Sequence, residues 1–538
     1  MGRVLLSKRA VLSVEMSLLI RLPVDILPSH LNRETLSIMR SLSGLDDSTN
    51  AELIKRWLIL ELHLNFLSKY RTMSAPAKAA VWFVVCNVLN KGLSLLATPI
   101  LTRIMSTDQY GMFSVFQSWV SIMTVFCTLN LFGGAFNRGR LDFKANQSQF
   151  ESSLLALSTV LTLIFFAFFC VAPEFWSEMM GLTPFLVVLL FVEIALNTAS
   201  SFWSARQRFE YRYRALVAVT LGSNFFSLGA GILAILCTDA KVEARVIMDV
   251  VAKGLPGAIL MVLIFARGKC FFNKKYWKYG LGFTLPLLPH FLSHYVLNQS
   301  DRLMISQMVN NSAAALYSVS YSISMALVIV VTAINDSYCP YTFQELDEDR
   351  VDGVRKSGYL ILALVAALTV MVMAFAPEIL AVFAGPEYSD AVDVIPPLSA
   401  SVFFIFFYSM MSNLEYFYKK TSLIATASVG AAVLNISLNL ALIPLFGYKA
   451  AAWTTLASYM ALAFMHWAFS ARICRVELGR QVYSGKYLLL SVALVLAMTL
   501  GMDVVYGIAV VRYAVLVALA FCLFVKRREI LTVVRRKG

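Results

Sequence analysis

Alternation between apolar segments and basic connectors is the dominant feature of this 538-residue chain. About fourteen apolar segments run from residue 79 to residue 525, and Lys and Arg fall almost entirely on every second connector between them. The other connectors hold few basic residues, namely Lys241, Arg245 and Lys449, with Arg103 at a segment end. Because short connectors rich in Lys and Arg remain in the cytosol, both ends of this region are expected to be cytosolic. The pattern predicts an all-α polytopic membrane protein with about 14 transmembrane helices.

The expected spans follow the apolar segments, most of which approach the roughly 20 residues needed to cross a hydrocarbon core. They cover residues 79–102, 110–135, 151–172, 183–205, 214–237, 246–266, 279–308, 313–337, 357–376, 391–413, 422–445, 450–471, 487–502 and 507–525. The thirteenth segment is short and Arg512 interrupts the fourteenth, so these two could instead form one re-entrant hairpin. That alternative leaves the topology of all preceding segments unchanged.

Composition excludes a soluble protein of ordinary architecture. Hydrophobic residues make up 59% of the chain and charged residues 14%, with a mean hydropathy of +0.71. The net charge of +14 would suggest nucleic acid as the ligand of a soluble protein, but these charges lie on short connectors beside anionic lipid headgroups. The excess therefore indicates orientation in membrane lipids and no nucleic acid partner. The eight cysteines are scattered without a CxxC pair, so neither a disulfide framework nor a zinc site is predicted.

Residues 1–72 differ from the rest of the chain. Their apolar stretches are too short to span a bilayer, and no small-residue cleavage site follows the stretch from residue 11 to 20. Two interpretations remain: a cytosolic amphipathic extension, or an upstream stretch that is absent from the mature protein, with Met73 as the start. The second is favoured, because MSAPAKAAVWF places a short basic leader directly before the first segment.

An internal repeat organises the spans. The stretch TRIMSTDQYGMFSV at 102–115 is echoed by DRLMISQMVNNSAAALYSV at 301–319, which relates the first two segments to the seventh and eighth. Because six helices is an even number, the two six-helix units are parallel repeats. We expect two lobes around a central cleft, formed by residues 73–270 and 271–480. Residues 481–538 then hold two further helices and a basic cytosolic tail.

Lys91 is the most informative polar residue inside an expected span. An ionised side chain at mid-bilayer costs about 2.5–3.5 kcal/mol on insertion scales, so it normally faces a cavity or a partner. Lys91 shares one helical stripe with Asn87, Ser94 and Thr98 and has no acid one turn away. This favours a cavity that faces an anion, and neutralisation by another helix, for example by Glu193, is the alternative.

Other spans carry polar groups at helical spacing. Asp249 and Lys253 are four residues apart and are expected to neutralise each other. The seventh segment holds a longer series: His290, His294, Asn298, Asp301 and Arg302, with Pro286 and Pro289 predicted to break the helix. No third ligand accompanies the histidine pair, which favours pore-lining or proton-sensitive histidines over a metal site. Asn435 and Asn439 favour interhelical hydrogen bonds.

Catalysis and ATP hydrolysis find no support in the sequence. No GxxxxGK[ST] motif is present, so any transport uses gradients or other proteins. Membrane glycosyltransferases usually place their catalytic acids on a large loop on the far side, whereas the far-side connectors here are short. We therefore expect a protein that is not an enzyme and that needs no cofactor.

Four stretches resemble the polysaccharide-export flippases, the Wzx-type family within the multidrug/oligosaccharidyl-lipid/polysaccharide exporter superfamily. They are TPILTRIMSTDQYGMFSVFQSWVSI, LNLFGGAFNRGR, PLLPHFLSHYVLNQSDRLMISQMVNNSAAALYSVSYSISMAL and YFYKKTSLIATASVGAAVLNISLNLALIPLFGYKAAAWTTLASY. Together they cover both expected lobes, from about residue 80 to residue 470. Residues 1–72 lie outside the resemblance.

The resemblance implies a flippase that moves an undecaprenyl-diphosphate-linked oligosaccharide across a bacterial inner membrane by alternating access. Its implied partners are the lipid-linked oligosaccharide, membrane lipids, and a polysaccharide polymerase with chain-length proteins. Cations in the cleft would contact the diphosphate, and polar groups the sugars: Lys91, Arg138, Arg302 and Lys253 for the first, and Asn87, Asn298 and Tyr321 for the second. The candidates for coupling to a proton or sodium gradient are Glu193, Asp249, Asp301, His290 and His294.

Three other functions remain open. A cation-coupled multidrug antiporter of the same superfamily would share the lobes but should prefer acidic and aromatic groups in its cavity. A flippase for the peptidoglycan precursor belongs to the same superfamily. A membrane glycosyltransferase or polymerase is the third alternative.

Overall fold

The computed structural model describes residues 72–535 of the chain. The predicted N-terminal extension and its alternative, a start at Met73, concern residues 1–71, which lie outside the described part. The chain divides into two compact units, Met1–Trp82 and Phe83–Gly538. The first unit is described only from Thr72, just before the helix that begins at Ala75. The second unit holds all the contacts and cavities reported below.

All regular elements of the described residues are helices, and these residues contain no strand. Up to the middle of the chain the elements are α4 (Ala75–Ile104), α5 (Thr107–Thr128), α6 (Gly134–Asp142), η3 (Lys144–Asn146), α7 (Gln147–Val171), α8 (Pro173–Met180), α9 (Pro184–Phe209), α10 (Tyr213–Leu236), α11 (Lys241–Gly268) and α12 (Lys274–Thr284). They continue with η4 (Leu285–Leu287), α13 (Leu288–Met308), α14 (Asn311–Asp347), α15 (Val351–Ala374), α16 (Ala376–Phe383), η5 (Pro386–Val394), α17 (Ile395–Phe417), α18 (Thr421–Phe446), α19 (Tyr448–Glu477), α20 (Gly485–Tyr506) and α21 (Ala509–Arg535).

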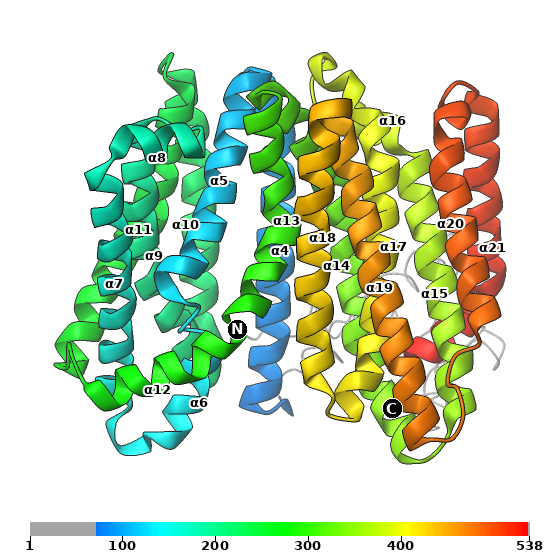
Figure 1. The fold of residues 1–538 in the computed structure, drawn as a ribbon, viewed down its shortest axis with the longest axis horizontal. Helices are drawn as coiled ribbons and strands as arrows, with labels where there is room; N and C mark the ends of the chain where they lie inside the picture. The colour runs from blue at the N-terminus through cyan, green and yellow to red at the C-terminus, as the bar shows by residue number, and fades with distance from the viewer. Residues whose placement is uncertain (1–71, 536–538) are drawn as a thin grey trace, which may run out of the picture. The chain divides into compact units, whose positions relative to one another are not determined.

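Within the described residues, 12 helices are long and apolar enough to cross a membrane. The prediction of an all-α, multi-pass membrane protein is therefore confirmed. Of the expected spans, α13 and α19 are missing from the 12, although Figure 1 shows both running alongside the others. Both carry polar groups that lower their hydropathy, so the exact number of 14 stays a prediction.

The prediction places the start of the seventh span, residues 279–308, too early in the sequence, because α13 begins only at Leu288. The structure divides this stretch into α12, η4 and α13, and Figure 1 shows α12 running across the bundle rather than along it. Pro286 and Pro289 cause the division, as predicted, because proline lacks the N–H group that a continuous helix would use. The spanning helix is thus α13 alone.

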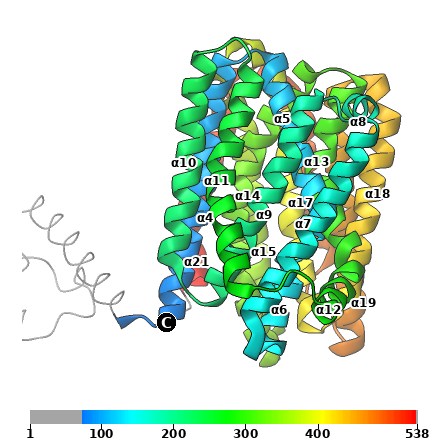
Figure 2. The same ribbon diagram turned by 90° about the vertical axis from the view of Figure 1, so that its left-hand side faces the viewer.

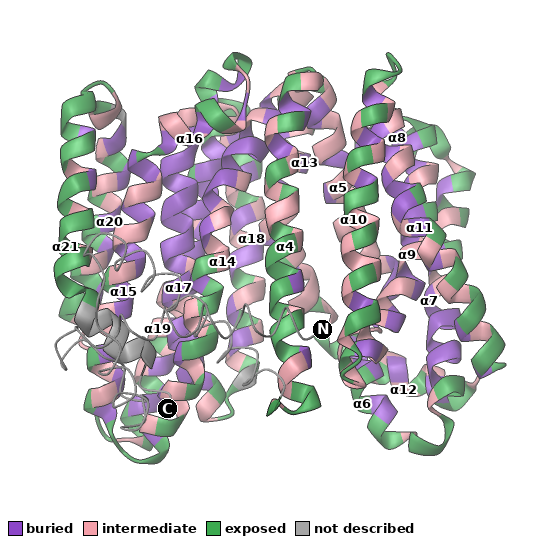
Figure 3. Ribbon diagram, turned by 180° about the vertical axis from the view of Figure 1, so that it is seen from behind, coloured by how far each residue is buried: buried purple, intermediate pink, exposed green. Residues whose placement is uncertain are grey.

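Helices of the second unit form two groups that meet along α5. In the first group α11 packs against α7, α9 and α10, and in the second α17 and α19 pack against each other and against α14 and α18. Helix α5 bridges them through contacts with α13 and α14, while α20 and α21 pack against α15 on the outside of the second group (Figure 1). Figure 3 shows buried residues concentrated along α17 and α14, whose interior position follows from these contacts.

The two ends of the bundle differ. Figure 2 shows α8 at one end, here called the far end, and α6 and α12 at the opposite end, here called the basic end. The basic end includes the connectors 206–214, 267–278 and 472–486, which are rich in Lys and Arg. Positive-inside topology would place it in the cytosol.

At the far end the two groups of helices are in direct contact. Ser114 and Ser318 share a hydrogen bond of 2.6 Å between α5 and α14, and Thr107 donates to Ser312 at 3.1 Å. A Cβ atom on Gly111 would lie 1.9 Å from a backbone oxygen of α14, so only glycine permits this approach of the two backbones. The far end is therefore tightly closed.

Candidate functional site

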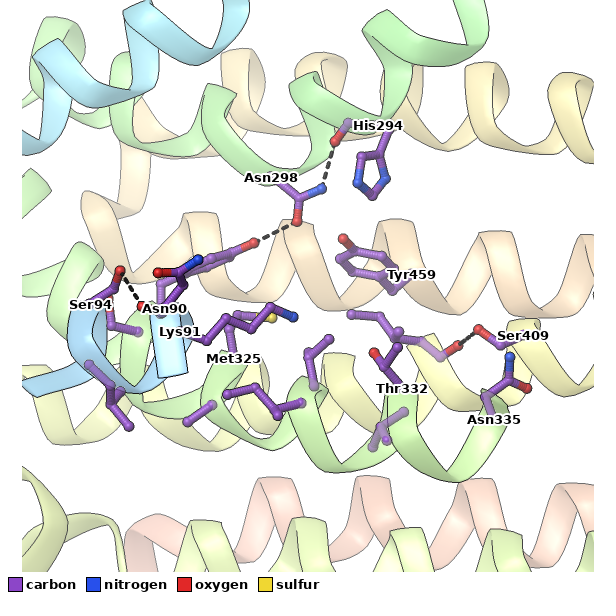
Figure 4. A pocket seen from close by; sticks show the side chains of 18 of the residues that line it. Asn90, Lys91, Ser94, His294, Asn298, Met325, Thr332, Asn335, Ser409 and Tyr459 are labelled. Atoms are coloured by element: carbon purple, nitrogen blue, oxygen red, sulfur yellow. Dashed lines mark hydrogen bonds between the residues drawn. The ribbon is translucent and has the colours of Figure 1, made fainter. Parts of the chain in front are cut away.

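A cavity of about 650 Å³ lies between α4 and helices of the second half of the chain. Residues of α4 line one side, and residues of α13, α14, α17 and α19 line the rest. Figure 4 shows how its polar side chains converge from these helices. The volume falls within the range of about 300–1,000 Å³ that is typical of ligand pockets.

A second cavity of about 350 Å³ adjoins the first. The two share Ser94, Arg302 and Ser322 as lining residues. The second cavity extends the polar space toward α5, α10 and α11 and is lined by Arg245, Asp249 and Lys253 among others. Together the two cavities form one cleft, which is called the central cleft below.

Lys91 extends into the central cleft from α4. Figure 4 shows its side chain reaching into the cavity beside Met325. Within the part of the chain that the structure describes, its ammonium group has neither an ion pair nor a hydrogen bond. The alternative partner, Glu193, is instead bonded to Lys253, with 3.0 Å between Nζ and Oε1. The structure thus leaves the charge of Lys91 available to a ligand.

Arg302 lines both cavities from α13 and is held by its neighbours. Its guanidinium lies 4.4 Å from the ring centroid of Tyr321 and donates to Gln299 Oε1 at 2.7 Å. Tyr321 in turn donates to Asn298 Oδ1 at 2.7 Å. Arg302 Nε is buried without a hydrogen-bond partner in the described residues. Three of the predicted contacts, Arg302, Asn298 and Tyr321, therefore form one connected group at the cleft.

Lys253 belongs to a charge-balanced network on the first group of helices. Its ammonium bonds Glu193 Oε1 at 3.0 Å and Asp249 Oδ2 at 3.1 Å. Arg245 lies 3.6 Å from the other oxygen of Asp249, which also accepts a hydrogen bond from Ser227. Two bases thus face two acids. The structure shows the expected pairing of Asp249 with Lys253 and adds Glu193 and Arg245 to it.

Removing the cation at the centre of this network should destabilise the protein. Lys253→Met leaves the carboxylate of Glu193, which is 1% exposed, without its ion-pair partner, and breaking a buried pair costs about 3–5 kcal/mol. Thermal unfolding in detergent should show a lower midpoint for Lys253→Met and a partial recovery when Glu193→Gln is added. Lys274→Met, which removes an exposed lysine of α12, is the control. Equal midpoints for wild type and Lys253→Met would contradict the assignment.

Asp301 is buried behind the cleft among neutral hydrogen-bond donors. Tyr317 and Thr455 donate hydroxyl hydrogen bonds to it, the second at 2.5 Å, and Asn439 and Asn435 donate from their amides at 2.6 Å and 3.3 Å. The two asparagines link α18 to α13, which is the interhelical role expected for them. No cation bonds this carboxylate in the described part of the chain. Its charge is therefore balanced only by neutral dipoles.

Five predicted site residues line neither cavity: Glu193 and Asp301, described above, and Asn87, Arg138 and His290. Asn87 is exposed and lines neither cavity, because the cleft begins one turn further along α4. Arg138 lies on α6 at the basic end, where it pairs with Asp142 at 3.4 Å and its side chain is 63% exposed (Figure 2). His290 also lines neither cavity, whereas His294 lines the first. The described residues contain no group of three or more His, Cys, Asp or Glu that could hold a metal ion.

Several residues of the cleft escaped the sequence analysis. Asn90 lines the first cavity and accepts a hydrogen bond from Asn224 of α10 at 2.9 Å. Its position four residues before Ser94 was the available signal. Tyr408 and Tyr459 also line the cavity, but each lies in a mainly apolar segment, where a tyrosine carries no distinguishing pattern. Arg245 was counted with a connector, although it lies inside α11.

Comparisons with known proteins identify relatives of much of the membrane region. A family model described as "Polysaccharide biosynthesis protein" matches residues 77–346. The Haemophilus influenzae protein "Lsg locus putative protein 1" is 21% identical over 386 residues, which cover 68% of this chain and 90% of that protein.

Solved structures of two transporters share the fold. The lipid II flippase MurJ, in an inward closed conformation, matches with a TM-score of 0.60 at 14% identity and covers 84% of this chain and 100% of its own. An inward-facing multidrug resistance MATE family transporter of the MOP superfamily matches with a TM-score of 0.53 at 14% identity, covering 73% of this chain and 96% of its own. These neighbours are flippases and transporters rather than enzymes, and they have the two-lobed MOP fold. Because the family model matches half of the chain, the chain belongs to the polysaccharide biosynthesis protein family, the flippase family that its sequence resembles.

Proposed function

We propose that this protein is a flippase that moves an undecaprenyl-diphosphate-linked oligosaccharide from the cytosolic to the outer leaflet of a bacterial inner membrane. The observation that carries the proposal is the unpaired Lys91, which lines the central cleft together with Arg302. A polysaccharide biosynthesis family and the MOP fold provide the context. A polysaccharide polymerase and chain-length proteins remain proposed partners.

The chemistry of the cleft suits such a ligand. A diphosphate must leave water to cross the membrane, which is costly unless fixed cations and hydrogen-bond donors replace its hydration. Lys91 of α4 and Arg302 of α13 provide these cations. Tyr408 and Tyr459 add aromatic faces, and Asn298 adds an amide, which together can contact both the apolar and the hydroxyl faces of sugars.

A cation-coupled drug antiporter fits the cleft less well. Such a transporter needs acidic groups that are free to bind a cation. In the described residues the only acid that lines the two cavities is Asp249, and it is already paired with Lys253 and Arg245. The unmatched charges of the cleft are positive, which favours an anionic ligand.

We further propose Asp301 as the residue that couples transport to a proton or cation gradient. Among the acids considered, Glu193 and Asp249 already have basic partners, whereas Asp301 is 2% exposed and has only neutral ones. A buried carboxylate without a cation is stabilised when it takes up a proton or a metal ion. The donors from α14, α18 and α19 make its state sensitive to the packing of the second lobe.

Reconstitution would test both proposals. Vesicles that contain the purified chain and a polyprenyl-diphosphate oligosaccharide in one leaflet should expose the glycan to a lectin on the other side, and protein-free vesicles should not. An Asp301→Asn protein should lose the response of this rate to an imposed proton or sodium gradient. No transfer of the glycan lipid by wild-type protein would overturn the function, and an unchanged gradient response would overturn the role of Asp301.

Orientation is a separate prediction. The connectors 206–214, 267–278 and 472–486 should be cytosolic, because they hold 13 Lys and Arg residues between them. In a chain whose native cysteines are replaced, Lys275→Cys should resist a membrane-impermeant maleimide in intact cells, and Glu387→Cys at the far end should react. The reverse labelling pattern would show that the orientation is wrong.

A further inference from the structure

A third cavity, of about 490 Å³, lies at the basic end and apart from the central cleft. It is formed where α9 ends, where the chain turns into α10, and where α11 ends. Four of its lining residues are arginines, Arg206, Arg212, Arg214 and Arg267, and none is acidic. This cavity is called the arginine pocket below.

The positive charge of the arginine pocket is only partly neutralised. Arg206 pairs with Glu151 at 2.9 Å, and Arg212 pairs with Glu210 at 3.3 Å. Glu210 also forms an ion pair with the buried Arg140, at 2.8 Å. Arg267 has no ion pair or hydrogen bond from its side chain within residues 72–535. Arg267 therefore leaves at least one guanidinium group of the pocket without an ion-pair partner among the described residues.

Gln207 gives an independent indication that the pocket receives a polar ligand. Its side chain lines the pocket, and the residue is only 5% exposed. Within the described chain its side-chain amide makes no hydrogen bond. Because this amide lines the pocket and has no partner in the described chain, a hydrogen-bonding group in the pocket would satisfy it.

The start of α10 completes the arginine pocket. Tyr213, Arg214 and Ala215 line it, and they are the first three residues of a 24-residue helix. The N-cap residue Arg212 supplies no side-chain hydrogen bond, and the N–H of Tyr213 is bonded to the carbonyl oxygen of Tyr211 at 3.2 Å. Uncapped helix N-termini favour anions, and here one coincides with a guanidinium cluster.

We propose that the arginine pocket binds phosphate groups, supplied by the headgroup of an anionic phospholipid. Guanidinium groups recognise phosphate through paired, charge-assisted hydrogen bonds. The aromatic residues of the pocket, Trp203, Tyr211 and Tyr213, are of the kinds that gather at the membrane interface. A free phosphate compound offers the same chemistry, so the experiment separates the two sources. The proposal is independent of what the central cleft transports.

Native mass spectrometry of the purified full-length chain in detergent would test it. The probes are short-chain phosphatidic acid, short-chain phosphatidylcholine and inorganic pyrophosphate. Phosphatidic acid should bind saturably and phosphatidylcholine should not. The double variant Gln207→Leu with Arg267→Ala should bind phosphatidic acid at least about tenfold more weakly, since it lacks one charged and one neutral hydrogen bond.

Two further variants make the result decisive. Arg267→Lys should keep part of the affinity because it retains the charge, and Lys274→Ala, which removes an exposed charge at the same end of the bundle, should bind as wild type does. Unfolding temperatures would show that each variant is folded. Binding of pyrophosphate but not of phosphatidic acid would support the pocket with a soluble phosphate as its source. Equal losses in the double variant and in Lys274→Ala would overturn the proposal, because they would show unspecific attraction.

Discussion

Lys91→Ala should abolish most glycan-lipid transfer without lowering the amount of protein in the membrane. Its ammonium group has no partner in the described residues and extends into the central cleft, so its loss leaves no unpaired acid behind. A hydrogen-bonded contact to a charged group contributes about 1.5–3 kcal/mol, which corresponds to a fall in rate of at least about tenfold. The transfer rate in vesicles and the protein level by immunoblot are the measurements.

Three variants control this experiment. Lys91→Arg should retain part of the rate, because it keeps the charge but changes its geometry. Asn87→Ala, one turn earlier on α4 and outside the cleft, should change the rate less than about twofold if it is an ordinary surface substitution. Glu193→Gln should not rescue Lys91→Ala, since Glu193 bonds Lys253. Normal transfer by Lys91→Ala would exclude the proposed role.

A covalent link across the far end should stop transport completely and reversibly. The Oγ atoms of Ser114 and Ser318 lie 2.6 Å apart between α5 and α14, so Ser114→Cys with Ser318→Cys places two thiols within reach of a disulfide. Alternating access requires this end to open. Oxidation of the pair should therefore trap the closed far end and stop glycan transfer, and a reductant should restore it.

The single variants provide the control for the crosslink. Each of them, in the same background without native cysteines, should transport at the same rate with and without oxidant. Intact-mass measurement after thiol alkylation would report how much disulfide has formed in the double variant. Undiminished transport by fully crosslinked protein would show that the far end does not open during the cycle.

The fold was predictable where the signal lies within one segment. Apolar length and the alternation of basic connectors determine where helices cross, and Pro286 and Pro289 indicate where one must break. The direction of α12 was not predictable, because the apolar residues Leu281 and Phe283 extend the hydropathy signal of α13 into a helix that lies across the bundle (Figure 1). Hydropathy reports the preference of a residue for an apolar environment and carries no information about helix direction.

The same distinction, between signals within one segment and features that depend on helix packing, applies to the candidate site. Asp249 and Lys253 lie on one face of one helix, so their pairing could be read from a spacing of four residues. The bond between Lys253 and Glu193 joins two residues that are 60 positions apart in the sequence and lie on different helices. It depends on helix packing that no local sequence pattern encodes. Arg138 was wrongly expected in the cleft: its charge suits a diphosphate, but its helix α6 lies at the basic end, where Arg138 pairs with Asp142.

Charge balance in the central cleft has a consequence for the response to membrane voltage. Lys253 and Arg245 are offset by Glu193 and Asp249, whereas Lys91 and Arg302 lack an acidic partner among the described residues. An empty cleft is then positive, and a bound diphosphate would offset it. Each elementary charge moved fully across 100 mV contributes about 2.3 kcal/mol.

An electric potential that is negative inside would accordingly draw the empty cleft back toward the cytosol and leave the loaded cleft almost unaffected. The membrane potential would then drive the return of the empty protein and would not drive the outward movement of the substrate. Charge displacement on a solid-supported membrane should accompany the return step and decrease in Lys91→Met. Charge displacement that accompanies only the step with bound substrate would contradict this prediction.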